Sequence, residues 1–410
     1  MKRPSSRLAS IVLFTTTLIA QAPSHAAGPR IAPVPESQRS AEQKALAERF
    51  ASSAIPNAVA TYLNHPLLAE HILPFEHYVS SDSGLPPRDR SLLILRTAWL
   101  TRSDYLWAHR AGAARQTGVT TDELRRIAEG PGANRWDTFD AVLLRAADEL
   151  HVDSFVSDAT WQALSERYNA NQLVDLVDTV GTLTMHAGAF NSLGLAIEAG
   201  LPERLPTGIP HTVAATRTNV RLLGREPRIP PLEPRDWTPE QRKRFDPNGT
   251  GQRAANVFVT FVRNPPADRL RGPINQHILN STTLSVRQRE TLLMRIGVLC
   301  RSEYEWAAHS RLGRRAGMTD ADVARIVAGP ESGGGDPLEV ALIRATDELY
   351  RDDRVSDETW AALAKGLDTK QLLDVLIAVG GYRATSMAIN SAGVQLDANM
   401  ADFRFPASLR

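Results

Sequence analysis

Residues 299–323 read LCRSEYEWAAHSRLGRRAGMTDADV, and residues 100–124 read LTRSDYLWAHRAGAARQTGVTTDEL. The two stretches align without a gap at a constant offset of 199 residues. The alignment continues downstream, where VSDATWQAL (156–164) meets VSDETWAAL (355–363). Similarity at one fixed period indicates a duplicated structural unit. We therefore predict that most of the chain consists of two copies of one domain.

The repeated unit has the pattern of α-helices. RDRSLLILRTAWL (88–100) and RQRETLLMRIGVL (287–299) carry apolar residues three and four positions apart, without the strict alternation of a strand. TTDELRRIAEG (120–130) combines a Thr cap, early acidic residues and a final Gly, which mark the start and the end of a helix. We predict an all-α fold made of two similar helical bundle domains.

The first 26 residues differ from the rest. Lys2, Arg3 and Arg7 accompany the apolar run LASIVLFTTTLIA (8–20), which is too short to span a bilayer comfortably. Small residues follow where a signal peptidase would cleave. We therefore predict a signal peptide at 1–26, cleaved near Ala26, and a periplasmic or secreted protein.

Composition limits the remaining possibilities. The 47 basic and 46 acidic side chains leave a net charge of +1, so no overall field attracts a polyanion, and we expect neither a nucleic-acid nor a membrane partner. Cys300 is the single cysteine, which excludes an intramolecular disulfide. The predicted domains are 27–205, a Pro-rich linker and wrapping segment at 206–250, and 251–410.

The richest group of reactive side chains lies within CRSEYEWAAHS (300–310). On a helix Ser302, Glu305 and His309 share one face, and Trp306 is close enough to border it. Glu290 stands 19 residues before His309, on the preceding helix, and can reach the imidazole if the two helices pack together. A carboxylate beside an imidazole raises its basicity, so that it exchanges a proton near neutral pH. The alternative is a solvated helix face with no chemistry.

A second group follows two glycines in GGYRATSMAINS (380–391). Tyr382 and Arg383 are placed where a helix can approach the site, and Arg383 can hold an anionic substrate through two hydrogen bonds. The alternative is a structural arginine paired with a nearby acid. Asn390 matches Asn191 of the other copy, so we interpret it as a buried hydrogen-bonding group rather than a catalyst.

The two copies are not equivalent at this site. At the offset of 199, the positions of Glu290, Glu305 and His309 are occupied by Ser91, Leu106 and Arg110. We therefore expect the carboxy-terminal copy to carry the chemistry and the amino-terminal copy to supply walls and an interface.

The stretch RETLLMRIGVLCRSEYEWAAHSRLGRRAGMT (289–319) resembles the carboxymuconolactone decarboxylase family, which shares the alkylhydroperoxidase D-like fold. The resemblance implies an all-helical fold, assembly into trimers or hexamers, and a Glu/His proton relay. The hydroperoxidase branch uses a Glu, a Cys-x-x-Cys pair and a His. Glu290 and His309 match its Glu and His, whereas Ser302 and Glu305 stand where its cysteines would be.

The missing cysteine pair favours a lyase over a peroxidase, because a thiol peroxidase needs an attacking and a resolving thiol. We predict an exported, cofactor-free decarboxylase or isomerase without a metal, acting on a small organic acid, a lactone or an aromatic-derived compound. It would assemble as a homo-oligomer, a trimer of pseudo-dimers. The predicted catalytic residues are His309, Glu290 and Glu305, and the predicted substrate-binding residues are Ser302, Trp306, Tyr382 and Arg383.

Three alternatives stay open at this point. Cys300 could act as the nucleophile of a one-cysteine peroxidase. The protein could bind a ligand without chemistry, as the altered first copy suggests. A metal could also bind at Glu290, Glu305 and His309, although one imidazole with two carboxylates is an unspecific set.

Overall fold

The computed structural model describes residues 28–50, 56–211, 213, 224–249, 254–406 and 409. Within these ranges the regular elements are helices, and no strand occurs among them, which confirms the all-α prediction. The predicted signal peptide at 1–26 lies outside the described residues and stays a prediction. The predicted homo-oligomer also stays a prediction.

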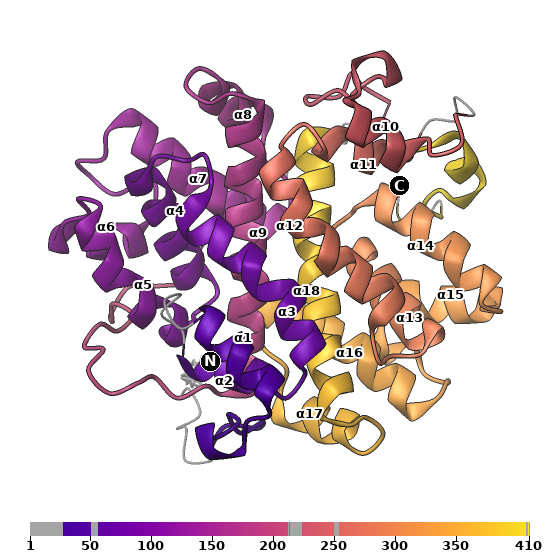
Figure 1. Ribbon diagram of the computed structural model, residues 1–410, viewed down its shortest axis with the longest axis horizontal. Coiled ribbons are helices and arrows are strands. Elements are labelled where there is room, and N and C mark those ends of the chain that lie inside the picture. Colours follow the sequence, from indigo (N-terminus) through magenta and orange to yellow (C-terminus); the bar gives the residue numbers. More distant parts are fainter. Residues whose placement is uncertain are drawn as a thin grey trace, which may run out of the picture.

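Each copy contributes the same series of helices, with the first copy from indigo to magenta in Figure 1 and the second from orange to yellow. The first copy contains α1 (Ala41–Phe50), α2 (Pro56–Tyr62), α3 (Pro66–His77), η3 (Tyr78–Asp82), α4 (Pro87–Leu100), α5 (Asp104–Gln116), α6 (Thr121–Glu129), α7 (Thr138–Asp153), α8 (Asp158–Ser165) and α9 (Ala170–Leu193). The second contains α10 (Pro239–Phe245), α11 (Asn256–Phe261), α12 (Pro265–Gln276), η5 (His277–Ser281), α13 (Val286–Leu299), α14 (Glu303–Arg315), α15 (Asp320–Ala328), α16 (Pro337–Asp352), α17 (Asp357–Ala364) and α18 (Thr369–Ala392). Short turns add η1 (Glu36–Gln38), η4 (Pro234–Asp236), η6 (Pro330–Ser332) and η7 (Ala398–Phe403).

The helix ends follow the signals in the sequence. Thr120 and Glu123 form a capping box at the start of α6, and Gly130 ends that helix with a φ of 96°. Thr319 caps α15 in the same way. The predicted linker 206–250 is less irregular than expected, because Thr238 caps a short helix, α10, that starts with a proline at its first turn.

Helices α9 and α18 lie side by side at the centre of the molecule (Figure 1). A Cβ atom on Gly181 would lie 2.9 Å from Cα of Ala384, and one on Gly380 would lie 2.8 Å from Cα of Met185. Gly181 and Gly380 occupy equivalent positions of the two copies. Two glycines thus allow the two long helices to approach backbone to backbone.

The two copies share one continuous apolar core rather than forming separate bundles. The extended segment before each copy crosses onto the other copy. Arg30 donates to the carbonyl of Val355 at 2.9 Å, and Arg228 donates to the carbonyl of Val156 at 2.7 Å. The copies are therefore interlocked, which the sequence pattern does not reveal.

Helix α18 is long and apolar enough to cross a membrane by length and composition alone. In the structure, 83% of its most apolar stretch is buried inside the protein. Its hydropathy therefore fits a central core helix packed on α9.

Candidate active site

Two adjacent helices position the predicted catalytic residues. Glu290 lies in the second turn of α13, and Glu305 and His309 lie one turn apart on α14. A tight turn at Arg301, with a φ of 51°, joins the two helices. Gly297 allows them to pack closely, since a Cβ there would lie 3.3 Å from the backbone nitrogen of Trp306.

The imidazole of His309 is held between two carboxylates. Its Nδ1 lies 2.8 Å from Oε2 of Glu290, and its Nε2 lies 3.2 Å from Oε2 of Glu305. The side chain of Glu290 is fully buried, whereas those of Glu305 and His309 each keep 5% of their surface exposed. The solvated-face alternative therefore does not hold, since the three groups converge inside the protein.

The carboxylates decide the protonation state of the imidazole. Burial by itself would lower the pKa of His309, but the hydrogen bonds with Glu290 and Glu305 outweigh burial and raise this pKa to about 9. Burial would also raise the pKa of Glu290, yet its hydrogen bond with His309 holds that pKa below the ordinary value. At neutral pH the site contains an imidazolium and ionised Glu290.

Arg289 and Tyr382 complete the surroundings of the pair. Nε of Arg289 donates to Oε1 of Glu290 at 2.8 Å, and Nη1 donates to the carbonyl of Leu279 at 2.5 Å. The ring of Tyr382 stands edge-on to the imidazole, with ring centroids 4.8 Å apart. Arg289 is in the sequence motif RQRE, but its role was not predicted because neighbouring residues on a helix usually point apart.

Two predicted substrate-binding residues lie close to the pair in sequence but have other surroundings. Ser302 is the N-cap residue of α14, and its buried hydroxyl has no hydrogen-bond partner among the described residues. Trp306 packs with Met294 and Phe405 in a separate apolar cluster, and its Nε1 donates to the carbonyl of Arg404. The structure thus places the indole in the core beside α13 and η7, away from the imidazole face.

Arg383 is a buried structural arginine in this arrangement. Its Nη1 donates to Asp353 at 2.7 Å, and its Nη2 donates to the carbonyl of His151 at 2.9 Å. Its side chain keeps 3% of its surface exposed. This geometry matches the alternative of an arginine paired with an acid, because both of its Nη atoms donate to groups away from His309.

Cys300 ends α13 in the core, with 1% of its surface exposed. Burial raises the pKa of its thiol to about 11. A nucleophilic cysteine needs an accessible thiolate, which burial and a high pKa both oppose. The environment of Cys300 therefore does not support the one-cysteine peroxidase.

The first copy has a different polar cluster at the equivalent place. Arg110, which stands in place of His309, forms an ion pair with the buried Glu76. The Nδ1 of His186 lies 3.0 Å from the hydroxyl of Tyr62, and burial lowers the pKa of His186 to about 4. Leu106 contributes only an apolar side chain, so the first copy has no imidazole held between two acids at this position.

A cavity of about 460 Å³, called the α12–α18 cavity, lies near the site of the second copy, although none of Glu290, Glu305, His309 and Tyr382 lines it. Leu279 and Gly381 belong to its wall; the carbonyl of Leu279 accepts from Arg289, and Gly381 precedes Tyr382. Its walls come from α3, α9, α10, α11, α12, η5 and α18, and they include Phe75, Phe261, Ile274, Asn275, Thr385 and Ala388.

The two copies differ at several positions that line the cavity. At the offset of 199, three of its lining residues are replaced by bulkier side chains in the first copy. Phe261, Asn275 and Thr385 correspond to Tyr62, Glu76 and His186, which are all buried. The cavity was not predicted from the sequence. These three differences between the copies point to a cavity only once the structure shows that Phe261, Asn275 and Thr385 surround the same space.

The carboxymuconolactone decarboxylase family model matches the chain at residues 66–143 and 265–348. The first match runs from α3 into α7, and the second runs from α12 into α16 and contains Glu290, Glu305 and His309. One region of each copy is thus similar to the carboxymuconolactone decarboxylase family. No curated protein and no solved structure matches the chain.

Proposed function

We propose that this protein is an exported decarboxylase that acts on a small organic acid or lactone by proton transfer through Glu305 and His309. The observation that carries the proposal is the buried imidazole held at 2.8 Å and 3.2 Å from two carboxylates. The family includes decarboxylases and alkylhydroperoxidase D-like peroxidases. The absence of a cysteine pair and the burial of Cys300 support the first of these activities.

His309 is proposed to act as the proton donor. Its pKa of about 9 keeps it protonated at neutral pH. In an acid whose carboxylate is attached to the carbon next to a carbonyl group, the bond between that carbon and the carboxylate breaks, carbon dioxide leaves, and the electron pair forms an enolate with the carbonyl group. Glu305 and His309 pass one proton to that enolate carbon, and water then restores the proton.

Glu290 is proposed to position His309 rather than to touch the substrate. Its carboxylate is fully buried between Arg289 and the Nδ1 atom of His309. A carboxylate on the inner nitrogen fixes the orientation of the ring and leaves the outer nitrogen for proton transfer. Glu305, which contacts that outer nitrogen, is the acid nearest to the reaction.

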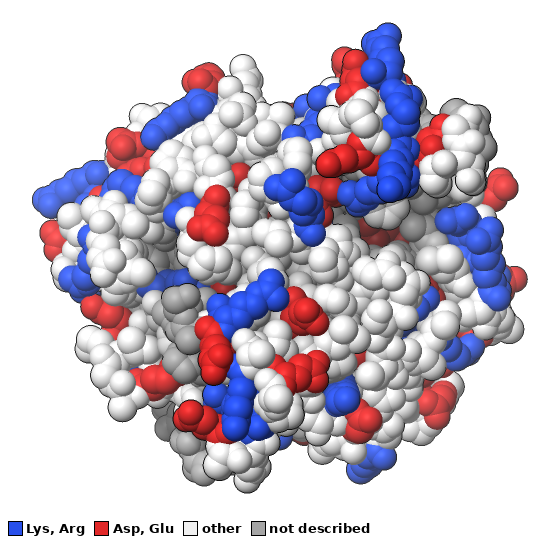
Figure 2. Space-filling model, viewed as in Figure 1, with Lys and Arg blue, Asp and Glu red and all other residues white. Residues whose placement is uncertain are grey.

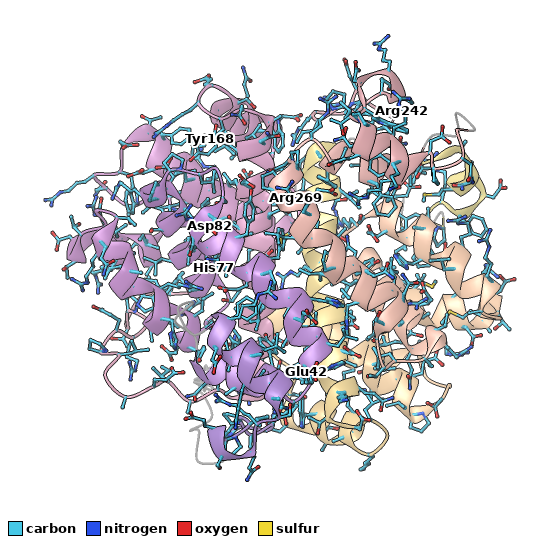
Figure 3. The ribbon with its side chains drawn as sticks, in the orientation of Figure 1. Glu42, His77, Asp82, Tyr168, Arg242 and Arg269 are labelled. Carbon is cyan, nitrogen blue, oxygen red and sulfur yellow. The ribbon has the colours of Figure 1, made fainter. Side chains whose placement is uncertain are left out.

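The α12–α18 cavity is proposed to hold the substrate. Its volume of about 460 Å³ is within the range of small-molecule sites. Basic side chains gather over the neighbouring α10, at the upper right of Figure 2. In Figure 3, Arg242 on α10 lies at the upper right and Arg269 on α12 nearer the middle of the view. In the cavity wall itself Arg244 and Arg271 are paired with Asp268 and Asp178, so the attraction for an anionic acid would come from the basic side chains around the cavity rather than from its lining.

The test compares matched positions of the two copies, with carboxymuconolactone as the first probe and released carbon dioxide as the readout. His309→Gln should lower kcat by about 100-fold or more, because general acid catalysis contributes roughly 10²- to 10⁴-fold. Arg110→Lys changes the equivalent position of the first copy while keeping a cation beside Glu76, and should retain most of the rate. Full activity in His309→Gln would refute the proposal.

A further inference from the structure

Two imidazoles and one carboxylate meet between the copies, on residues separate from the Glu290–His309 pair. His65 caps α3 of the first copy, which packs on α12 in front of the central helix pair (Figure 1), while His277 starts η5 and Asp374 lies on α18. Oδ1 of Asp374 lies 2.8 Å from Nε2 of His277 and 3.5 Å from Nε2 of His65. Ligand atoms of a tetrahedral ion with bonds of about 2.1 Å lie about 3.4 Å apart, so these distances nearly suit one.

The nitrogen atoms of this group are buried and only partly used. His65 and His277 keep 3% and 1% of their surface exposed. Nε2 of His65 and Nδ1 of His277 have no hydrogen-bond partner among the described residues. A third imidazole, His71 of α3, stands 5.5 Å from the ring of His277, and its buried Nδ1 also lacks a partner there. Buried polar atoms without partners are costly, and the free Nε2 of His65 is the nitrogen that lies 3.5 Å from Asp374, so this atom indicates a missing ligand.

The carboxylate is oriented toward the imidazoles by its other oxygen. Oδ2 of Asp374 accepts from the backbone nitrogen of Thr283 at 2.6 Å and from the hydroxyl groups of Thr282 and Thr283. Such outer contacts fix a carboxylate ligand in place. Nδ1 of His65 lies 3.5 Å from the backbone nitrogen of Leu68, at the long limit of a hydrogen bond. Moving a proton onto Nδ1, which frees Nε2 for a ligand, therefore disturbs only a weak contact.

The equivalent place in the other copy contains no imidazole and is satisfied without a ligand. Asp175 stands where Asp374 does. Its Oδ1 accepts from the hydroxyl of Tyr78 at 2.8 Å and from the amide of Asn264 at 2.7 Å, and its Oδ2 accepts from the backbone nitrogen of Gly84. Hydroxyl, amide and backbone donors are therefore enough to satisfy the aspartate at this position of the fold.

Imidazoles replace those donors at only one of the two equivalent places. His277, His65 and His71 stand where the other place has Tyr78, Asn264 and Leu270. A hydroxyl or amide donor suffices for the hydrogen bonds to the aspartate. What a neutral imidazole adds is a nitrogen lone pair, which is the group that binds transition metals.

We propose that His65, His277 and Asp374 bind one divalent transition-metal ion of the Zn²⁺ class, with His71 at its rim. Two imidazoles and a carboxylate suit zinc, cobalt or iron better than calcium or magnesium, which prefer oxygen ligands alone. Because His65 belongs to the first copy and the other two ligands to the second, the ion ties the copies together. The site is independent of the proposed decarboxylase activity.

The experiment uses the full chain, stripped of metal with a chelator and titrated with Co²⁺, which gives visible d–d absorption when bound by nitrogen and oxygen ligands. We expect one Co²⁺ per chain, displaced by Zn²⁺. The double variant His65→Asn with His277→Tyr introduces the asparagine and the tyrosine that stand at the equivalent positions around Asp175. It should bind Co²⁺ at least about 100-fold more weakly, because loss of even outer contacts costs 10- to 100-fold.

The control is His77→Gln, which removes an exposed imidazole next in sequence to Tyr78. His77 pairs with Asp82 at 3.4 Å on the surface (Figure 3), so its loss should leave Co²⁺ affinity unchanged. If the double variant unfolds, His277→Gln keeps an amide donor toward Asp374 and should also lose the Co²⁺ absorption. A stripped wild-type chain that binds no Co²⁺, or a folded variant that binds it as tightly as wild type, would overturn the proposal.

Discussion

At the scale of single residues, the proposed site is a group of charges that compensate one another. Glu290 and Glu305 supply two negative charges, and protonated His309 with Arg289 supplies two positive ones. Burial of an uncompensated charge is strongly unfavourable, whereas a paired and hydrogen-bonded set is tolerated. Removal of one member should therefore change the protonation of the others before it changes the fold.

Removal of the outer carboxylate should lower the pKa of His309. In the wild type this pKa is raised to about 9 by Glu290 and Glu305 together. With Glu305→Gln one of the two acids is gone, so the pKa should fall toward the ordinary value. NMR titration of the imidazole resonances measures it. Glu303→Gln is the control, because Glu303 pairs with Arg404 instead. An unchanged pKa in Glu305→Gln would contradict this account of the site.

The raised pKa of His309 also predicts how stability depends on pH. Below about pH 6.5 the imidazole is protonated in both the folded and the unfolded chain, and its full contribution to stability is present. As pH rises from about 6.5 to about 9, only the folded chain holds the proton, so this contribution is lost. The loss is roughly 3 kcal/mol in the free energy of unfolding.

Urea unfolding at several pH values measures this loss. The variant His309→Gln should show a flatter pH dependence across the same interval, since it has no proton to lose there. If wild type and His309→Gln fell in parallel, another group would be responsible.

At the scale of elements, the position of the site depends on how closely α9 and α18 approach. Tyr382 reaches His309 from α18, directly after the two glycines of that helix. One of these, Gly380, faces the backbone of α9 at Met185. Anything that separates the two helices should therefore also move the ring of Tyr382.

Gly380→Ala tests this packing. The added methyl group would lie 2.8 Å from Cα of Met185, so the helices must move apart. We expect a loss of about 1–3 kcal/mol in the free energy of unfolding, the usual cost of overpacking. Gly112→Ala is the control, because a Cβ on this residue of α5 meets nothing within 4 Å. It should stabilise the protein by about 0.5–1 kcal/mol through helix propensity. Equal effects of both substitutions would argue against tight packing of α9 on α18.

At the scale of the whole molecule, the two copies are joined by their shared core, by the crossing segments and by side-chain hydrogen bonds. Asn191 donates to the carbonyls of Thr101 and Asp353, so one amide ties both copies. Asn390 does the same from the other side, with the carbonyls of Cys300 and Ser154. Asn390 is therefore a hydrogen-bonding group, as predicted, but it is half-buried rather than buried. The two copies share one apolar core, and the segment before each copy crosses onto the other. The copies therefore cannot separate without breaking these contacts.

The full chain should therefore unfold in one transition. Calorimetry should give one heat-absorption peak whose van't Hoff and calorimetric enthalpies agree. Asn390→Ala removes bonds to both copies and should shift that peak to lower temperature without splitting it. Two resolved transitions in the wild type would show that the copies unfold independently.

Much of the site was predictable because its residues are near one another in sequence. Glu305 and His309 are one turn apart, and Glu290 lies on the adjoining helix. Helix periodicity and the assumption that the two helices pack together were therefore enough to predict that the three side chains meet. Trp306 was predicted to bind substrate because it is near His309 in sequence, and Arg383 because it follows two glycines where a helix could approach the site. The structure instead turns the indole toward Phe405 and engages the guanidinium with Asp353, contacts that depend on distant segments.

The sequence by itself determined the duplication, the all-helical fold, the helix caps and the restriction of the Glu/His set to the second copy. These follow from local periodicity and from comparison of the chain with itself. Only the tertiary structure decided that the copies interlock, that a cavity lies among α11, α12 and α18, and that His65 meets His277 and Asp374. These features join residues from both halves, and no local pattern encodes which surfaces will meet across the central pair of helices.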